Sequence, residues 1–176
     1  MNVFLWIMIA GTAVIVVFSW ITSLKAGRFH GIARFFAFES LLALFLLNVP
    51  YWFRNPLSIR QIFSWIFLIG SIIPAVWGTV LLIGRGNPEG QWENTTRLVT
   101  AGIYRRIRHP LYASLLYLGI GIFLKNITPA TASLLALDGI AVFLTGVIEE
   151  REMKARFGEA YAVYMKSTKR FIPSIF

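Results

Sequence analysis

The sequence contains no cysteine, and only two of its residues are histidine. Without cysteine the chain forms no disulfide, offers no thiolate nucleophile and has no cysteine metal ligand. A catalytic metal usually takes three protein ligands, so His30 and His109 do not predict a metal site. Asp138 is the sole aspartate, which excludes an aspartyl protease, because that chemistry needs two aspartates.

Charged residues are also scarce: they make up 14% of the 176 residues, against 57% hydrophobic residues. They are concentrated in a few short stretches, which leaves uncharged runs long enough to cross a bilayer. The composition therefore predicts a single all-α integral-membrane domain over residues 1–176. The net charge of +9 does not indicate a nucleic-acid partner. The basic residues lie between apolar segments, where they meet anionic headgroups of membrane lipids.

Five segments have the length and composition of transmembrane helices. The first has no basic residues in front of it and is longer than the apolar core of a signal peptide, so we expect a retained helix. The fourth is short, because fifteen residues at about 1.5 Å each cover about 22 Å of a hydrocarbon core of about 30 Å. The predicted spans are residues 3–22, 35–53, 62–83, 110–124 and 127–148.

Lysine and arginine are distributed unequally between the two sides of this five-helix arrangement. Segments 23–34, 84–109 and 149–176 together carry 14 of them, and the alternate segments carry 3. Because cytoplasmic loops are enriched in these residues, we expect the N-terminus outside and the C-terminus in the cytoplasm. The first three spans then fall within residues 1–83. Residues 84–176 comprise a cytoplasmic loop, a helical hairpin and a cytoplasmic C-terminal amphipathic helix.

The stretch RIRHPLY, residues 106–112, combines basic side chains with the start of the fourth span. Proline is favoured in the first helical turn, so His109 is the predicted N-cap and Pro110 the first helical residue. A helix start exposes unpaired backbone N–H groups and the positive end of the helix dipole, which favour an anion. Two simpler interpretations stay open. The arginines anchor the cytoplasmic side, and His109 is a neutral interfacial histidine.

Two adjacent glutamates follow the fifth span. Only the residues KNITP join spans four and five, so these form an antiparallel hairpin, which places Glu149 and Glu150 at the same membrane depth as His109. On a continued helix both glutamates flank an apolar stripe, whereas Glu152 and Glu159 point elsewhere. We interpret the pair as hydrogen-bond acceptors at the cytoplasmic mouth of the bundle. The alternative is an interfacial amphipathic helix with two incidental acids. The stripe comprises Met153, Phe157, Tyr161 and Tyr164.

The C-terminal half combines several short motifs. They are Gly102-Ile103-Tyr104, Arg108-His109-Pro110 followed by Tyr112, the glutamate pair, and Phe157-Gly158 followed by Tyr161. In this combination residues 97–176 resemble the isoprenylcysteine carboxyl methyltransferase family and its relatives, the phospholipid N-methyltransferases. One position departs from that pattern, because Ser114 stands where the family commonly has glycine.

The resemblance implies a multi-pass membrane methyltransferase that uses S-adenosylmethionine on its cytoplasmic side, without a metal. Its acceptor would be a lipophilic small molecule or lipidated substrate, first of all a prenylcysteine-type carboxylate. A carboxylate needs a cation to position it rather than a base, and we assign that catalytic part to Arg106 or Arg170. The expected cofactor-binding residues are Leu98, Gly102, Tyr104, Arg108, His109, Tyr112, Glu149 and Glu150.

Three other functions stay open. A phospholipid amine acceptor would need a proton removed, which a carboxylate or tyrosine near the donor could do. A membrane reductase of the sterol-reductase type would bind NADPH in the same cavity. A non-catalytic protein would use its arginines and C-terminal helix only to bind anionic lipids.

Overall fold

The computed structural model describes residues 3–90 and 94–174, and within these ranges it contains helices and no β-strand. The α-helices are α1 (Val3–Thr22), α2 (His30–Asn48), α3 (Ile59–Arg85), α4 (Pro110–Phe123), α5 (Pro129–Phe157) and α6 (Glu159–Ser167). Short 3-10 helices occur in three connections, at Leu24–Ala26, Val49–Tyr51 and Gly102–Arg105. The all-helical prediction is confirmed.

Four of these helices, α1, α2, α3 and α5, are long and apolar enough to cross a membrane. The chain is therefore a multi-pass membrane protein. α4 is apolar but has only 14 residues, so the fifth span stays a prediction. Most predicted boundaries lie within three residues of the observed ones. The larger differences are that α2 begins at His30 and ends at Asn48, and that α5 continues to Phe157.

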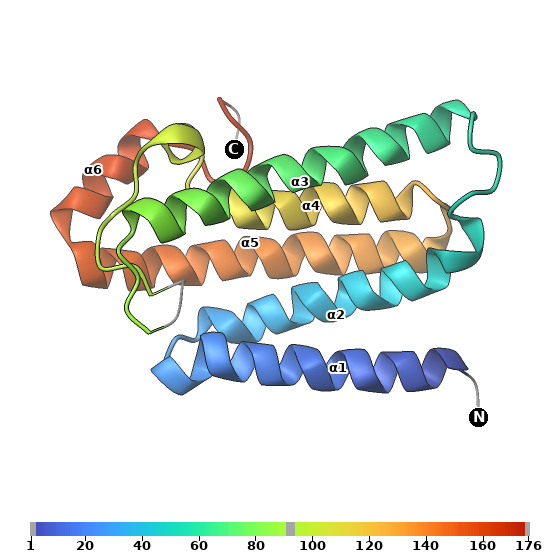
Figure 1. Ribbon diagram of the computed structural model, residues 1–176, viewed down its shortest axis with the longest axis horizontal. Coiled ribbons are helices and arrows are strands. Elements are labelled where there is room, and N and C mark those ends of the chain that lie inside the picture. The colour runs from blue at the N-terminus through green and yellow to red at the C-terminus, as the bar shows by residue number, and fades with distance from the viewer. Residues whose placement is uncertain (1–2, 91–93, 175–176) are drawn as a thin grey trace.

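Helices α1 to α5 lie side by side along the longest axis of the molecule (Figure 1). α2 packs against α5 and carries α1 on its outer side, while α3 packs against α4. Consecutive helices run in opposite directions, because each connection returns the chain to the next helix at the same end. The α1–α2 connection, the α3–α4 connection and α6 therefore gather at one end of the bundle, on the left in Figure 1.

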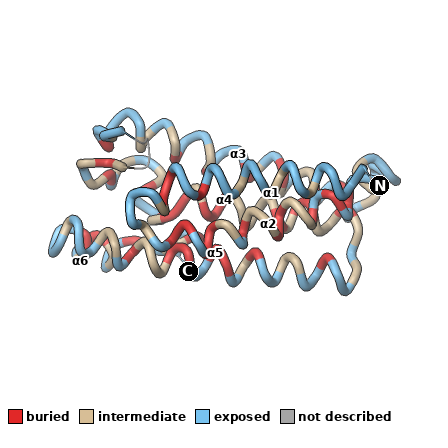
Figure 2. The backbone as a smooth tube through the Cα atoms, turned by 90° about the horizontal axis from the view of Figure 1, so that it is seen from below, coloured by how far each residue is buried: buried red, intermediate tan, exposed pale blue. Residues whose placement is uncertain are grey.

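The outward faces of the helices are apolar and exposed. Figure 2 shows the exposed positions along α1 and the outer side of α3, with buried residues between the helices. Val14 in α1 is 68% exposed, and Val80 in α3 is 62% exposed. Apolar surfaces of this extent suit a hydrocarbon environment.

Close packing holds the short helix α4 between α3 and α5. A Cβ atom at Gly121 would lie 2.8 Å from the Leu68 side chain of α3, and one at Gly119 would lie 2.8 Å from Oδ2 of Asp138 in α5. The Ser64 hydroxyl also donates to the Gly121 carbonyl at 2.6 Å. Ser114, the departure from the family pattern, is 7% exposed and donates to the carbonyl of Leu111. A serine therefore fits in this packed helix.

A buried lysine closes the end of the bundle opposite the α1–α2 connection. Lys125, in the α4–α5 connection, has no exposed surface, and burial lowers the pKa of its ammonium group. Its Nζ donates to Oε1 of Gln61 at 2.9 Å and lies 3.8 Å from the ring centroid of Trp65. Both partners belong to α3, so the amide and the aromatic ring tie the α4–α5 connection to α3.

The single helix expected after the fifth span is interrupted at Gly158. This residue has φ 57° and ψ −133°, a conformation that side chains disfavour, and it separates α5 from α6. The break turns α6 back over the end of the bundle (Figure 1). Tyr161 and Tyr164 of the predicted stripe are buried, at 3% and 7% exposure. The expectation of a continuous helix was wrong, but the stripe does form a contact surface.

We expect successive connections between the helices to lie on opposite sides of the membrane, because the basic residues are concentrated in every second connection. Reporter fusions after Ser23, Asn94 and Phe176 should report a cytoplasmic location, and fusions after Asn55 and Asn126 an external one. Phosphatase and fluorescent-protein reporters, used in parallel at each site, measure the two outcomes. A cytoplasmic signal at Asn126 would show that α4 does not cross the membrane.

Candidate functional site

A cavity opens at the end of the bundle where the α1–α2 connection, the α3–α4 connection and α6 meet. The space between its lining atoms is ≈ 750 Å³, including the open mouth. The N-terminal part contributes Arg28, His30 and Arg34, and α3 with its following connection contributes Leu82, Thr95, Leu98, Val99, Tyr104 and Arg108. The N-cap and first turn of α4 contribute His109, Pro110, Leu111 and Tyr112. Helices α5 and α6 contribute Glu149, Met153, Phe157, Tyr161 and Tyr164.

The start of α4 is held by the C-terminal segment. His109 is the N-cap and Pro110 the first helical residue, as RIRHPLY predicts. The backbone N–H of Arg108 donates to the carbonyl of Lys169 at 2.7 Å, and that of His109 donates to the carbonyl of Arg170 at 3.0 Å. In return, the N–H of Lys169 donates to the carbonyl of Arg106 at 3.1 Å. This short parallel pairing positions the N-terminus of the helix against the cavity.

An ion-pair cluster lies behind this helix start. Nε of Arg108 donates to Oε1 of Glu150 at 2.9 Å, and the Arg170 guanidinium donates to both carboxylate oxygens at 2.9–3.1 Å. Arg108 also donates to the carbonyls of Met165 and Thr168. The Glu150 side chain is 5% exposed, so it is shielded from solvent while it binds both arginines. Glu150 thus fastens the C-terminal segment to the start of α4.

His109 lies between the two glutamates. Its Nδ1 is 3.6 Å from Oε2 of Glu149, and its Nε2 is 3.4 Å from Oε1 of Glu150. The imidazole stacks on the Tyr112 ring, with centroids 5.4 Å apart and an interplanar angle of 24°. Oε2 of Glu149 is buried and accepts no hydrogen bond from the described residues. Glu149 also lines the cavity.

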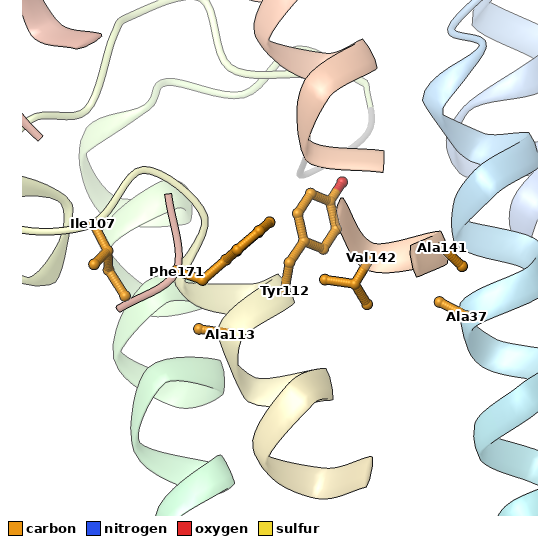
Figure 3. Close-up of a cluster of buried hydrophobic side chains, with 7 residues drawn as sticks. All are labelled: Ala37, Ile107, Tyr112, Ala113, Ala141, Val142 and Phe171. Atoms are coloured by element: carbon orange, nitrogen blue, oxygen red, sulfur yellow. The ribbon is translucent and has the colours of Figure 1, made fainter. Parts of the chain in front are cut away.

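A compact apolar cluster packs against the part of the cavity around His109. Figure 3 shows Tyr112 and Phe171 beside Val142 of α5, with Ala37 of α2 at the far side. Val142 has no exposed surface, and Phe171 is 2% exposed. The cluster fixes the rings that flank His109, because side chains packed at this density have few alternative rotamers.

Three buried tyrosines complete the wall. The Tyr164 hydroxyl donates to the carbonyl of Tyr104 at 2.7 Å, and the Tyr104 hydroxyl donates to the carbonyl of Gly78 at 3.4 Å. Burial, with a smaller contribution from the negative charge of Glu149, raises the pKa of the Tyr104 and Tyr161 phenols. Burial also raises the pKa of Tyr164. All three phenols therefore stay neutral and act as hydrogen-bonding groups rather than as bases at ordinary pH.

The comparison with known families agrees with this arrangement. The profile of the phospholipid methyltransferase family matches residues 59–160, more than half of the chain. The chain belongs to the phospholipid methyltransferase family. The resemblance drawn from the C-terminal motifs is thereby confirmed, and the protein is a membrane methyltransferase. No curated protein matches the chain.

The family match contains most of the residues that the motifs singled out. Six of the eight expected cofactor residues line the cavity: Leu98, Tyr104, Arg108, His109, Tyr112 and Glu149. Glu150 does not line it and binds Arg108 and Arg170 instead. Gly102 is exposed with φ 60°, and a Cβ there would lie 2.6 Å from the Leu81 side chain. The positive φ thus favours glycine at this turn.

Neither arginine expected to position the acceptor lines the cavity. Arg106 is exposed, and its carbonyl pairs with the backbone of Lys169. The guanidinium of Arg170 is bound to Glu150. Among the described residues, no group of three or more histidine, cysteine, aspartate or glutamate side chains could hold a metal ion.

The motifs missed the contribution of the N-terminal quarter, which precedes the family match. Nδ1 of His30 lies 2.6 Å from Oε2 of Glu152, and its Nε2 lies 3.2 Å from the Ser23 hydroxyl. This connectivity is that of a serine–histidine–carboxylate triad. However, Ser23 has no exposed surface and accepts a hydrogen bond from Arg34. The chain of contacts therefore joins α2 to α5. The sequence did hold one indication that this segment contributes to the site. The count of basic residues placed residues 23–34 on the same side of the membrane as His109.

Proposed function

We propose that the chain transfers a methyl group from S-adenosylmethionine to a lipophilic acceptor in the cavity at the end of the bundle. The observation that carries the proposal is Glu149, which lines the cavity and lies within the family match, and whose buried Oε2 accepts no hydrogen bond from the described residues. A buried carboxylate oxygen without a donor is costly unless a ligand supplies one. The ammonium group and ribose hydroxyls of S-adenosylmethionine are such donors.

The other lining residues fit the same cofactor. Met153, Phe157 and Leu98 offer apolar surface to an adenine ring. The first turn of α4, which begins at Pro110, has backbone N–H groups without helical partners, and these suit a carboxylate. S-adenosylmethionine supplies a methyl group on a positively charged sulfur. The protein then has to align the two reactants and exclude water, because the transfer is a direct displacement.

The first candidate for the acceptor is a prenylcysteine-type carboxylate, and the second is a phospholipid amine. A carboxylate acceptor is supported by the basic side chains on the cavity wall, which would bind and orient an anion. The amine is supported by the description of the matched family. An amine has to lose a proton, and among the described residues Glu149 is a carboxylate that lines the cavity. In both cases the distribution of basic residues favours the cytoplasmic side of the membrane for the cavity.

Methyl transfer in liposomes tests the proposal. We expect transfer from radiolabelled S-adenosylmethionine to a farnesylated cysteine derivative or to phosphatidylethanolamine, and none to the corresponding acceptor without its tail. Each methylene group buried in lipid stabilises the bound acceptor by about 0.8 kcal/mol, so apparent affinity should rise with tail length until partitioning is complete.

Calorimetry on the purified protein provides the control. S-adenosylhomocysteine should bind, and NADPH should not. Binding of NADPH alone would favour the reductase, and binding of neither ligand would favour a protein that only binds lipids. Equal methylation of acceptors with and without a tail would show that the substrate enters from water.

A further inference from the structure

The α1–α2 connection and the start of α2 form a basic wall of the cavity, made of Arg28, His30 and Arg34. All three residues precede the family match, which begins at residue 59, whereas Glu149 lies inside it. The resemblance covers enzymes whose acceptors are as different as prenylcysteine and phospholipid, but whose methyl donor is the same. A wall that lies outside the matched range therefore suits the acceptor better than the donor.

The two arginines of this wall converge on one residue, Thr22. NH2 of Arg28 donates to the Thr22 carbonyl at 2.7 Å, and NH2 of Arg34 donates to the Thr22 hydroxyl at 2.6 Å. Arg34 also donates to the Ser23 hydroxyl at 2.8 Å, and its guanidinium lies 5.3 Å from the ring centroid of Phe18. Arg34 is only 4% exposed. The guanidinium groups are thus held in place beside the cavity before any ligand binds.

The basic wall also contacts α5, the helix that carries Glu149. The backbone N–H of His30 donates to Oε1 of Glu152 at 3.3 Å, and its Nδ1 lies 2.6 Å from Oε2. Glu152 follows Glu149 by three residues on α5, so their Cβ atoms lie about one helical turn apart, about 5–6 Å. The contact between His30 and Glu152 therefore holds the start of α2 beside the part of α5 that carries Glu149.

We infer that Arg28 and Arg34 form an anion-binding subsite for the head group of the acceptor. This inference rests on the proposed function. The guanidinium group binds carboxylate and phosphate oxygens with two parallel hydrogen bonds, which also sets the orientation of the anion. The negative Glu149 repels an anion and suits the cationic reactant instead. The acceptor is thus an amphiphile whose carboxylate or phosphate lies at the α1–α2 wall and whose tail lies among the apolar helices.

Binding of alkyl anions to the purified protein in a neutral detergent tests this subsite. The probes are dodecyl phosphate, dodecanoate and inorganic phosphate, titrated calorimetrically. We expect Arg28→Gln to weaken binding of the preferred alkyl anion at least tenfold, about 1.4 kcal/mol. Arg28 is half-buried, whereas Arg34 is almost fully enclosed, so Arg28→Gln is the variant less damaging to the fold. The tighter of the two alkyl probes identifies the head group as phosphate or carboxylate.

Lys25→Gln is the matched control. Lys25 is exposed in the same connection and does not line the cavity, so its replacement should leave alkyl-anion binding unchanged. Arg28→Lys should retain part of the affinity, because it keeps the charge but not the two parallel hydrogen bonds. Equal affinity of wild type and Arg28→Gln would overturn the inference. Inorganic phosphate bound as tightly as dodecyl phosphate would overturn the assignment to a lipid head group.

S-adenosylhomocysteine separates this inference from the proposed function. Arg28→Gln should change its affinity by less than about threefold, well below the tenfold effect on the alkyl anion. If the two affinities fall together, or if saturating S-adenosylhomocysteine displaces dodecyl phosphate, the arginines belong to the donor and the inference is wrong. If the wild type binds dodecyl phosphate through Arg28 but does not bind S-adenosylhomocysteine, the anion subsite stands and the methyltransferase proposal fails.

Discussion

Replacing Glu149 by glutamine is expected to weaken S-adenosylhomocysteine binding by about ten- to one-hundredfold, about 1.4–2.8 kcal/mol, with a loss of stability of about 1 kcal/mol or less. The glutamine keeps the shape of the side chain but removes the charge that would strengthen hydrogen bonds from the ligand. Oε2 of Glu149 accepts no hydrogen bond from the described residues, and the stability that is lost comes from its 3.6 Å ion pair with His109. Calorimetry measures the affinity, and a thermal-shift assay in detergent measures the stability.

Glu159→Gln is the control for this variant. Glu159 is exposed at the start of α6 and does not line the cavity, so both quantities should match those of the wild type. Unchanged affinity in Glu149→Gln would show that the donor does not use this carboxylate. The proposal that S-adenosylmethionine binds at Glu149 would then be wrong, even though the family membership would stand.

The neighbouring Glu150→Gln is expected to act on stability instead, with a loss of about 3 kcal/mol in the free energy of unfolding. Glu150 accepts hydrogen bonds from Arg108 and Arg170, and its side chain is 5% exposed. Removing its charge leaves two guanidinium groups without their carboxylate in a region of low solvent access, where an uncompensated charge is costly. Unfolding in mixed micelles with increasing SDS measures the difference.

A double-mutant cycle with Arg170→Met checks this mechanism. Removing Arg170 as well relieves one of the two uncompensated charges, so the double variant should be more stable than the sum of the single effects predicts. A coupling of about 1 kcal/mol or more is expected for groups in direct contact. Strictly additive effects would mean that the contact between Glu150 and Arg170 contributes nothing to the fold. A loss of S-adenosylhomocysteine binding at full stability would place Glu150 in the donor site.

Local chemistry and chain connectivity made several features predictable. Proline at the first position of α4 and His109 at its N-cap follow from the restricted backbone of proline, and the structure has both. A five-residue connection forces α4 and α5 to run antiparallel. Glu149 therefore had to lie near His109, and their side chains approach to 3.6 Å. The apolar runs likewise specify helices, because a backbone in lipid has to satisfy its own hydrogen bonds.

The sequence by itself thus determined an all-helical membrane protein and the family motifs at one end of its bundle. Only the tertiary structure decided that Glu150 binds arginines while Glu149 faces the cavity. A helical wheel places these two adjacent residues on either side of the same apolar stripe and does not say which neighbours each one meets. Tertiary structure also brought Arg28 and Arg34 to the cavity, through a contact between His30 and Glu152. That contact joins residues 122 positions apart, a separation across which no local pattern in the sequence operates.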